Sequence, residues 1–392
     1  MLSIKYFSRT IKMKRSILYK PLILLLLVCI GYIIVFSAHA YTVKQTVYGD
    51  GAYYFSWLHS IFIDHDINFS NEYIRFNLTQ PFTESGMPIN KYAIGPSLLW
   101  APFYLWTHSI VRGDGYTFPY QFVIGLTTVL YVLTGLLLLY RLLCTSVKPT
   151  IAALTIFLIA VATNLLFYGS VDTVNSHGLS FFASVLFLTF LFQRQSFGIG
   201  IALALLALMR PQDAVFALLL LPYLKRNTII PILSGFVLLF SHQLLVWFAF
   251  TGNPFISPYF IGGEHYSLQT PHIMQVLFSL KNGLLLYTPL FIIAGIGYMK
   301  AWKTYEKFRY ASIAVLLITL YLTASWSAWD QGASYSGRMF VALLPIIALP
   351  LANLLSRMTN TIVKLEHLYM IFVLPLGGIN ILLILYFLLT HA

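Results

Sequence analysis

The sequence predicts an all-α, polytopic membrane protein with about eleven transmembrane helices, and three observations lead to this fold class. Of 392 residues, 59% are hydrophobic and only 9% are charged, whereas a soluble domain is about one quarter charged. The mean hydropathy is +0.79. Apolar runs long enough to cross a bilayer recur along the whole chain. Because no internal repeat or low-complexity linker interrupts them, we expect a single integral membrane domain over residues 1–392.

Nine apolar runs account for most of the predicted spans, since a helix rises 1.5 Å per residue. They are Pro21 to Ala40, Tyr120 to Leu143, Ile151 to Phe167, Gly178 to Phe192, Thr228 to Phe250, Gly283 to Met299, Ala311 to Ser325, Met339 to Leu355 and Leu368 to Thr390. Two further segments are interrupted. Ile94 to Val111 contains two prolines, and Phe197 to Leu224 contains Arg210 followed by a proline.

The distribution of basic residues resolves both interrupted segments, because cytoplasmic loops carry an excess of Lys and Arg. With a cytoplasmic N-terminus, Ile94 to Val111 has to return to the outer side as an interfacial or re-entrant helix. Phe197 to Leu224 has to form two short helices that meet at an outer turn around Arg210. This topology places a charge of +15 on the cytoplasmic side and −3 on the outer side, with ten of the twelve acids outside. We therefore expect a multi-pass cell-membrane protein whose first outer loop, 41–117, carries interfacial helices.

Several classes of site are not predicted. The basic N-terminal segment could pass for part of a signal peptide, but the run after it is long enough to span, so we expect an uncleaved first helix. Cys29 and Cys144 lie in apolar runs without neighbouring ligands, which suggests neither a disulfide nor a zinc site. There is no nucleotide-binding loop and no HExxH motif. Because the charges sort by side of the membrane, the basic balance does not indicate a nucleic-acid partner.

Asp50 is the first candidate functional residue and lies in the stretch YGDGAYYFSWLHSIFIDHD. It has one structural interpretation, as the N-cap of the helix that follows. That helix carries an apolar stripe typical of a helix lying at the membrane surface, formed by Tyr54, Trp57, Leu58, Ile61 and Phe62. A carboxylate there would be ionised where a base is needed to act on a membrane-anchored substrate. Gly49 and Gly51 would leave room for that substrate beside the backbone.

The end of the same stretch offers oxygen ligands for a hard divalent cation. Asp64 and Asp66 alternate with His65 and are followed by Asn68 and Glu72. The glycine turn and the ligand spacing of a calcium loop are absent, so Asp64 and Asp66 are only weak metal candidates. The alternative is a solvated helix end and turn.

Three basic residues lie beside apolar helices at the predicted outer boundary, where ionisable groups are candidates for function. Lys91 precedes the proline-containing helix; it either extends along the apolar surface to reach water or meets an anionic lipid headgroup as a point charge. Arg210 interrupts the helical hairpin. Arg338 either takes part in a site or forms an ion pair with Asp330.

These motifs together resemble the GT-C superfamily, the polytopic glycosyltransferases that use lipid-phosphate-linked sugars and include protein mannosyltransferases and aminoarabinose transferases. The resemblance rests on YGDGAYYF, KYAIGPSLLWAPFYL, LMRPQDAVFALLLLPY and WSAWDQGASYSGRMFVALLPIIALPLA. It implies that Asp50, the acid in the first outer loop, is catalytic. It also implies that Lys91, and more loosely Arg210 and Arg338, contact the donor phosphate. The chain departs from the family where the usual acid pair is replaced by Asp-Gly, and no soluble C-terminal acceptor-binding domain is evident.

The resemblance therefore predicts a glycosyltransferase that moves a sugar from a polyprenyl-phosphate donor to an acceptor at the extracytoplasmic face. A donor flipped across the membrane agrees with the outer position of the candidate residues, whereas a nucleotide sugar would be used on the cytoplasmic side. Phosphate is a good leaving group, so the enzyme needs cations to stabilise it and one base, not the two carboxylates of a glycoside hydrolase. Membrane lipid and the lipid-linked donor are the expected partners, the acceptor is a glycan, lipid or protein, and no cofactor is firmly predicted.

Two other classes of function compete with this prediction. A multi-pass transporter would show inverted repeats, discontinuous helices in matching halves and charges near the bilayer midplane. A non-catalytic scaffold is compatible with the long outer loop.

Overall fold

The computed structural model describes residues 15–79, 86, 88–300, 306–361 and 365–391, and these residues form helices without any β-strand. The first half of the fold comprises α1 (Arg15–Val43), α2 (Asp50–His59), the π-helical η2 (Ser60–Asp64), α3 (Ser70–Arg75), α4 (Gly95–Val111), α5 (Phe118–Leu143), α6 (Pro149–Val161), α7 (Leu165–Ser170), α8 (Ser176–Gln193) and α9 (Ser196–Met209).

The second half begins with the 3₁₀-helix η3 (Pro211–Leu220). It continues with α10 (Arg226–Thr251), α11 (Pro258–Ile261), α12 (Ile273–Phe278), α13 (Leu284–Tyr287), α14 (Leu290–Lys300), α15 (Glu306–Ser325), the 3₁₀-helix η4 (Arg338–Leu343), α16 (Leu344–Thr361), α17 (Leu365–Leu368), the π-helical η5 (Tyr369–Val373) and α18 (Leu374–His391). The all-α prediction is thus confirmed.

Seven helical segments in the described part of the chain are long and apolar enough to cross a membrane, which supports a multi-pass membrane protein. They are Pro21–Val43, Phe118–Leu143, Ser176–Gln193, Arg226–Thr251, Phe308–Ser325, Arg338–Thr359 and Tyr369–Thr390. Four shorter apolar helices accompany them, namely Pro149–Val161, Ser196–Met209, Pro211–Leu220 and Leu290–Met299.

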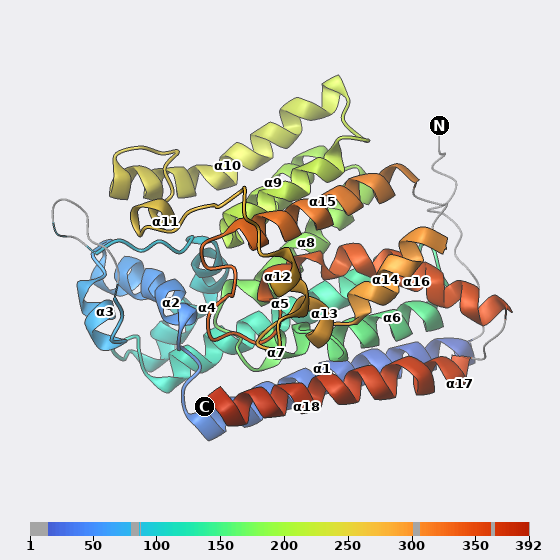
Figure 1. Cartoon of the computed structure of the whole chain (residues 1–392). Coiled ribbons are helices and arrows are strands. Elements are labelled where there is room, and N and C mark those ends of the chain that lie inside the picture. The colour runs from blue at the N-terminus through green and yellow to red at the C-terminus, as the bar shows by residue number, and fades with distance from the viewer. Residues whose placement is uncertain (1–14, 80–85, 87, 301–305, 362–364, 392) are drawn as a thin grey trace.

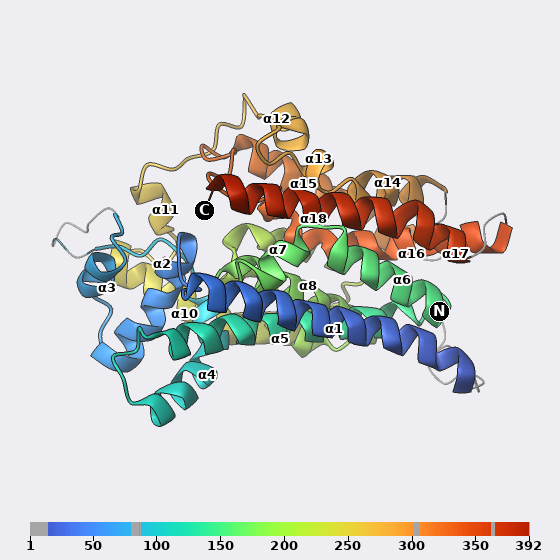
Figure 2. The ribbon, with the colours of Figure 1, turned by 90° about the horizontal axis from the view of Figure 1, so that it is seen from below.

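The long helices form an elongated bundle with two distinct ends (Figure 1). At one end lie α2, α3 and α11; at the other lies α17 (Figures 1 and 2). We call the former the α2 end. Inside the bundle α5 packs on α8, α8 on α9, and α9 on α10. Helix α6 contacts both α1 and α18, and Figure 2 shows it between them.

The segment around Arg210 forms the two short helices that the charge pattern predicts. Gly200 of α9 lies directly against the backbone of Ile232 in α10. Near the far end of α9, Leu208 lies against Gly95, and the backbone N–H of the adjacent Ile94 donates to Gln243 Oε1 of α10. Later residues of α9 thus lie beside later residues of α10, so the two helices run parallel. The intervening η3 must therefore run in the opposite direction.

Helix α2 differs from its predicted position at the membrane surface. Tyr54, Trp57 and Leu58, which belong to the predicted lipid-facing stripe, are all buried inside the protein. Trp57 packs against Phe69 and against Phe250 of α10, so protein rather than lipid covers the stripe. By contrast α4 keeps exposed apolar side chains, among them Trp106, and its interfacial position stays a prediction.

The basic N-terminal segment before residue 15 and the loop around Lys303 lie outside the described residues. The prediction of an uncleaved, cytoplasmic N-terminus therefore stays a prediction. Both cysteines are free and partly buried, as expected.

Candidate functional site

A cavity of about 430 Å³ brings together all four residues singled out as catalytic or phosphate-binding candidates: Asp50, Lys91, Arg210 and Arg338. They come from the start of α2, the segment before α4, the α9–η3 turn and the start of η4. Helices α10 and α15 complete the wall with Trp247, Leu322 and Thr323. The volume falls in the range of ordinary small-molecule sites, about 300–1,000 Å³.

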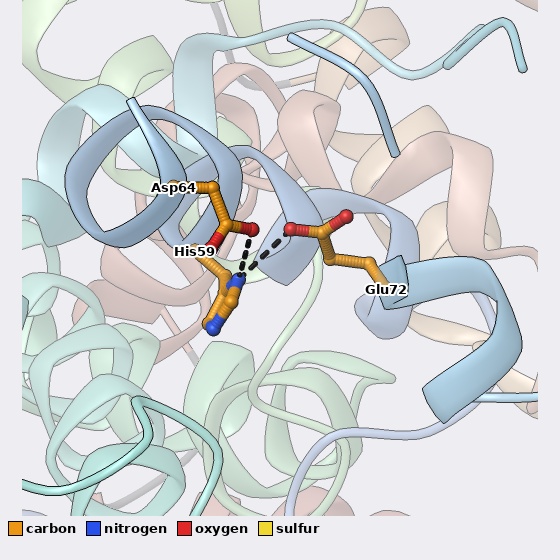
Figure 3. A group of neighbouring side chains, drawn as sticks. All are labelled: His59, Asp64 and Glu72. Carbon is orange, nitrogen blue, oxygen red and sulfur yellow. Dashed lines mark hydrogen bonds and ion pairs between the residues drawn. The ribbon is translucent and has the colours of Figure 1, made fainter. Parts of the chain in front are cut away.

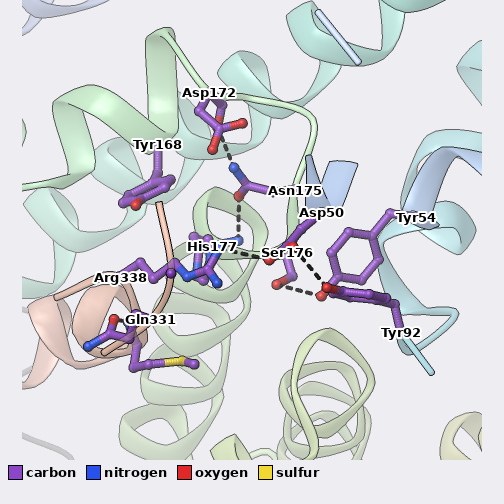
Figure 4. Close-up of polar contacts among 12 residues, drawn as sticks. Asp50, Tyr54, Tyr92, Tyr168, Asp172, Asn175, Ser176, His177, Gln331 and Arg338 are labelled. Carbon is purple, nitrogen blue, oxygen red and sulfur yellow. Dashed lines mark hydrogen bonds and ion pairs between the residues drawn. The ribbon is translucent and has the colours of Figure 1, made fainter. Parts of the chain in front are cut away.

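Asp50 and Arg338 form an ion pair in this cavity. Arg338 NH1 donates to Asp50 Oδ2 at 2.7 Å, and the Tyr92 hydroxyl donates to Asp50 Oδ1 at 2.8 Å. The side chains of Asp50 and Arg338 are 32% and 20% exposed, respectively. Figure 4 shows the carboxylate between Tyr92 on one side and the guanidinium of Arg338 on the other. Both carboxylate oxygens are therefore engaged, yet the group remains accessible from the cavity.

The N-cap interpretation of Asp50 is wrong. Helix α2 is capped by Gly49 without any side-chain hydrogen bond, and Asp50 is the first helical residue. Burial raises the pKa of Asp50, but Arg338 and the hydrogen bond from Tyr92 more than offset this and hold the pKa below its usual value. Asp50 is consequently ionised throughout the physiological pH range.

Gly51 serves packing rather than substrate access. A Cβ at this position would lie 2.1 Å from the carbonyl oxygen of Val174, so glycine lets the first turn of α2 pack on the segment between α7 and α8. Gly49 has a positive φ of 52° with open space around it, a conformation that favours glycine. The structure thus corrects our expectation for Gly51.

Lys91 is neither free nor merely extended toward water. Its ammonium group forms an ion pair with Glu264. The same group lies 5.5 Å from the ring centroid of Tyr92 and 5.4 Å from that of Tyr259, within cation–π range. Lys91 thus lines the cavity with most of its charge already balanced.

Arg210 has a different environment. Its NH1 donates to His177 Nδ1 at 2.8 Å, and NH2 faces Met339 Sδ. Because a guanidinium only donates, His177 Nδ1 must be unprotonated and its ring neutral. Arg210 is buried, and among the described residues no carboxylate lies within ion-pair distance of it. The nearby Asp213 still interacts with it electrostatically, so Arg210 differs from Lys91 and Arg338 in lacking a direct carboxylate contact.

The alternative ion pair of Arg338 with Asp330 does not form. Asp330 instead pairs with Lys281 at 2.8 Å, and both side chains are largely exposed. Arg338 lies at the start of η4, and its guanidinium contacts Asp50 instead.

Sequence reasoning missed three residues that line the cavity, Tyr92, His177 and Glu264, and also Asp172, which is not part of the lining but interacts electrostatically with Asp50 and Arg338. Tyr92 and Glu264 contact Asp50 and Lys91, respectively, and His177 contacts Arg210. Burial raises the pKa of Asp172, which lies near Asn175, to about 6. Tyr92 could have been recognised because it follows Lys91 in the sequence. The other three residues stand in no sequence pattern that indicates a site.

A second polar cluster lies at the other end of α2. His59 Nδ1 is 3.0 Å from Asp64 Oδ2 and 2.9 Å from Glu72 Oε1 (Figure 3). Asp66, one of the two weak metal candidates, does not join it. Its Oδ1 accepts hydrogen bonds from Ser60 Oγ and from the backbone N–H of Asn68, so it stabilises the turn after η2. The cluster thus contains Asp64 and Glu72, both from the run of oxygen ligands noted in the sequence, together with His59, which the metal prediction did not include.

Comparison with protein-family models and with curated proteins finds no match to this chain. The fold therefore defines the class, a multi-pass all-α membrane protein with a polar cavity.

Proposed function

We propose that this protein is a membrane glycosyltransferase that moves a sugar from a polyprenyl-phosphate donor to an acceptor hydroxyl. The observation that carries the proposal is the convergence of one carboxylate, Asp50, and three cations, Lys91, Arg210 and Arg338, on a single cavity. These residues come from four separate sequence segments. A departing phosphate needs cations to stabilise its negative charge, and the acceptor hydroxyl needs one base. The cavity contains both kinds of group.

In the proposed reaction the bond between the sugar C1 and the phosphate oxygen breaks, and a bond between C1 and the acceptor oxygen forms. Polyprenyl phosphate leaves with the electron pair, and Asp50 takes the acceptor proton. Asp50 suits this role because it is ionised and partly exposed to the cavity. Asp50 is a weak base. It can therefore take the acceptor proton only after the acceptor oxygen has begun to bond to C1 and its O–H has become more acidic.

Arg210 is the best candidate for the donor phosphate, because no carboxylate pairs with it in the described structure. Arg338 offers a second contact: its Nε is buried and has no hydrogen-bond partner among the described residues. A buried unpaired donor is costly, and a phosphate oxygen would satisfy it. Lys91, paired with Glu264, contributes more weakly than the sequence implied.

The wall of the cavity supports a lipid-linked substrate. Trp247 belongs to α10 and Thr319, Leu322 and Thr323 to α15, and both helices are apolar enough to span the membrane. A phosphate held at Arg210 would thus have its apolar tail beside these two helices. Four short apolar helices accompany the seven long ones, and the count of about eleven spans stays a prediction. In this topology the cavity opens on the extracytoplasmic side.

The decisive experiment is a transfer assay with purified Asp50→Asn protein. General-base assistance contributes about 10²–10⁴-fold in rate, so the variant should lose that much turnover while its donor binding stays near wild type. Asp330→Asn is the matched control, because Asp330 also lines the cavity but pairs with Lys281; it should retain activity within a few-fold. Turnover of Asp50→Asn close to that of the control would refute Asp50 as the base.

The rival transporter function has its own readout in the same preparation. Wild-type protein in sealed vesicles that moves the lipid-linked sugar across the bilayer without forming a transfer product would favour transport over the proposed chemistry.

A further inference from the structure

The cluster of His59, Asp64 and Glu72 joins three neighbouring elements at the α2 end. His59 is the last residue of α2, Asp64 the last of η2, and Glu72 lies in α3. Their side chains are 5%, 27% and 0% exposed, respectively. Their nearest ligand-type atoms all lie within 4.8 Å of one another, and Figure 3 shows the three groups pointing toward a common centre.

The hydrogen bonding of the imidazole identifies which nitrogen is available. His59 Nε2 lies 3.1 Å from the carbonyl oxygen of Asp114; because a carbonyl only accepts, Nε2 carries a hydrogen. In a neutral ring Nδ1 then carries no hydrogen and has a free lone pair. That lone pair faces Asp64 Oδ2 and Glu72 Oε1 at about hydrogen-bond distance, which is repulsive unless a positive charge lies between them.

The charge balance favours a divalent cation over a single proton. Asp64 and Glu72 form ion pairs with no Lys or Arg in the described part of the chain. A proton on His59 Nδ1 would balance only one of the two carboxylates, whereas a divalent ion with a neutral imidazole balances both.

Glu72 provides an independent indication of a missing ligand. It is completely buried, and its Oε2 has no hydrogen-bond partner among the described residues. Its other oxygen, Oε1, contacts His59, but a buried polar atom left without a partner is costly.

We propose that His59, Asp64 and Glu72 bind one divalent transition-metal ion of the Zn²⁺ type, which fastens α2, η2 and α3 together. One imidazole with carboxylates suits Zn²⁺ better than Ca²⁺ or Mg²⁺. In a tetrahedral zinc site the ligand atoms stand about 3.3 Å apart. The observed separations of 3.0 and 2.9 Å from Nδ1 need only small shifts. A water or the Tyr116 hydroxyl, 3.0 Å from Nδ1, would complete the coordination.

The surroundings resemble the outer contacts of known metal sites. Metal-binding histidines usually donate their second ring N–H to a carbonyl or carboxylate, as His59 does to Asp114. Asn71 Nδ2 donates to Asp64 Oδ2 at 2.6 Å and orients that carboxylate.

The proposed ion is structural rather than catalytic. None of its three ligands lines the cavity of Asp50, and the ten residues of α2 separate His59 from Asp50 by about 14 Å along the helix axis. The inference is therefore independent of the proposed transferase activity.

The test uses the purified full-length protein in detergent, stripped of metal with EDTA and then supplied with ZnCl₂ or CaCl₂. We expect one Zn²⁺ per chain by elemental analysis and a rise in Tm with ZnCl₂ that CaCl₂ does not reproduce. Glu72→Gln and Asp64→Asn should each weaken Zn²⁺ affinity more than about 100-fold and abolish the Zn²⁺-dependent rise in Tm.

Asp66→Asn is the matched control, because Asp66 lies two positions from Asp64 but bonds only to the turn; it should bind Zn²⁺ like wild type. Each variant is compared with and without metal, so a change in its basal stability does not obscure the result, and Asp64→Asn serves if Glu72→Gln does not fold. Absence of Zn²⁺ binding by wild type would assign a proton to His59 instead. Equal binding by both ligand variants would place the ion elsewhere. Either result overturns the proposal.

Discussion

Arg338 and Asp50 are separated by 288 positions in the sequence, yet the guanidinium of one donates to the carboxylate of the other at 2.7 Å. The pair links the start of α2 to the start of η4 and lies in the cavity. It both compensates the charge of Asp50 and lowers its pKa.

Replacing Arg338 with Gln should move the acid limb of the transfer reaction to higher pH. Burial raises the pKa of Asp50 and Arg338 opposes it, so removing the guanidinium leaves burial less opposed and the base protonates at a higher pH. The measurement is the pH dependence of kcat/KM. Lys281→Gln removes the ion pair with Asp330, which does not involve Asp50, and should leave the profile unchanged; an unshifted profile for Arg338→Gln would contradict the electrostatic role.

Arg210→Gln should weaken binding of the lipid-phosphate donor more than Lys91→Gln does. Arg210 has no carboxylate partner in the described structure, whereas Lys91 is paired with Glu264. A hydrogen bond between charged groups contributes about 1.5–3 kcal/mol, or roughly 10- to 100-fold in Kd. Donor titration of both purified variants measures this, with Tm as the folding control. The reverse order would restore Lys91 as the main phosphate ligand, as the family resemblance implies.

Asp172→Asn should stabilise the protein at neutral pH. The pKa of Asp172 is raised by burial to about 6 in the folded state against about 3.9 when unfolded. The folded state therefore binds more protons between these values, and stability falls as pH rises from about 4 to about 6. The Tm advantage of the variant should be largest above pH 6 and vanish near pH 4.

Asp330→Asn provides the control of opposite sign for that experiment. Lys281 lowers the pKa of Asp330, so its contribution is present above the unfolded pKa and lost at lower pH. Replacing it should slightly destabilise the protein at pH 7 and have no effect at low pH. A Tm difference for Asp172→Asn that is constant across pH would contradict the raised pKa.

The predicted topology places Thr145 in the cytoplasm and Gln269 outside. Both residues are exposed in the structure, so single cysteines at these positions are suited to labelling in a background lacking Cys29 and Cys144. A membrane-impermeant thiol reagent added to intact cells should label position 269 only. Labelling of both positions from one side would refute the topology.

The sequence by itself determined the all-α membrane class, the hairpin at Arg210 and the identity of the four candidate residues lining the cavity. Apolar composition decides the first, because only helices satisfy their backbone hydrogen bonds within one apolar segment. The hairpin followed from counting basic residues on each side. Asp50, Lys91, Arg210 and Arg338 were identifiable because charges are rare in this chain and each is conspicuous beside apolar helices.

Only the tertiary structure decided how those residues are paired. An ion pair depends on where side chains meet in space, and the sequence separation of Asp50 from Arg338, or of Lys91 from Glu264, carries no information about that meeting. For the same reason the alternative of Arg338 with Asp330, close in sequence, was wrong. The metal cluster shows the same limit: Asp64 and Asp66 look equivalent in sequence, but the turn after η2 directs Asp66 to Ser60 while α3 brings Glu72 to His59. Local pattern selects residue types, whereas helix packing selects partners.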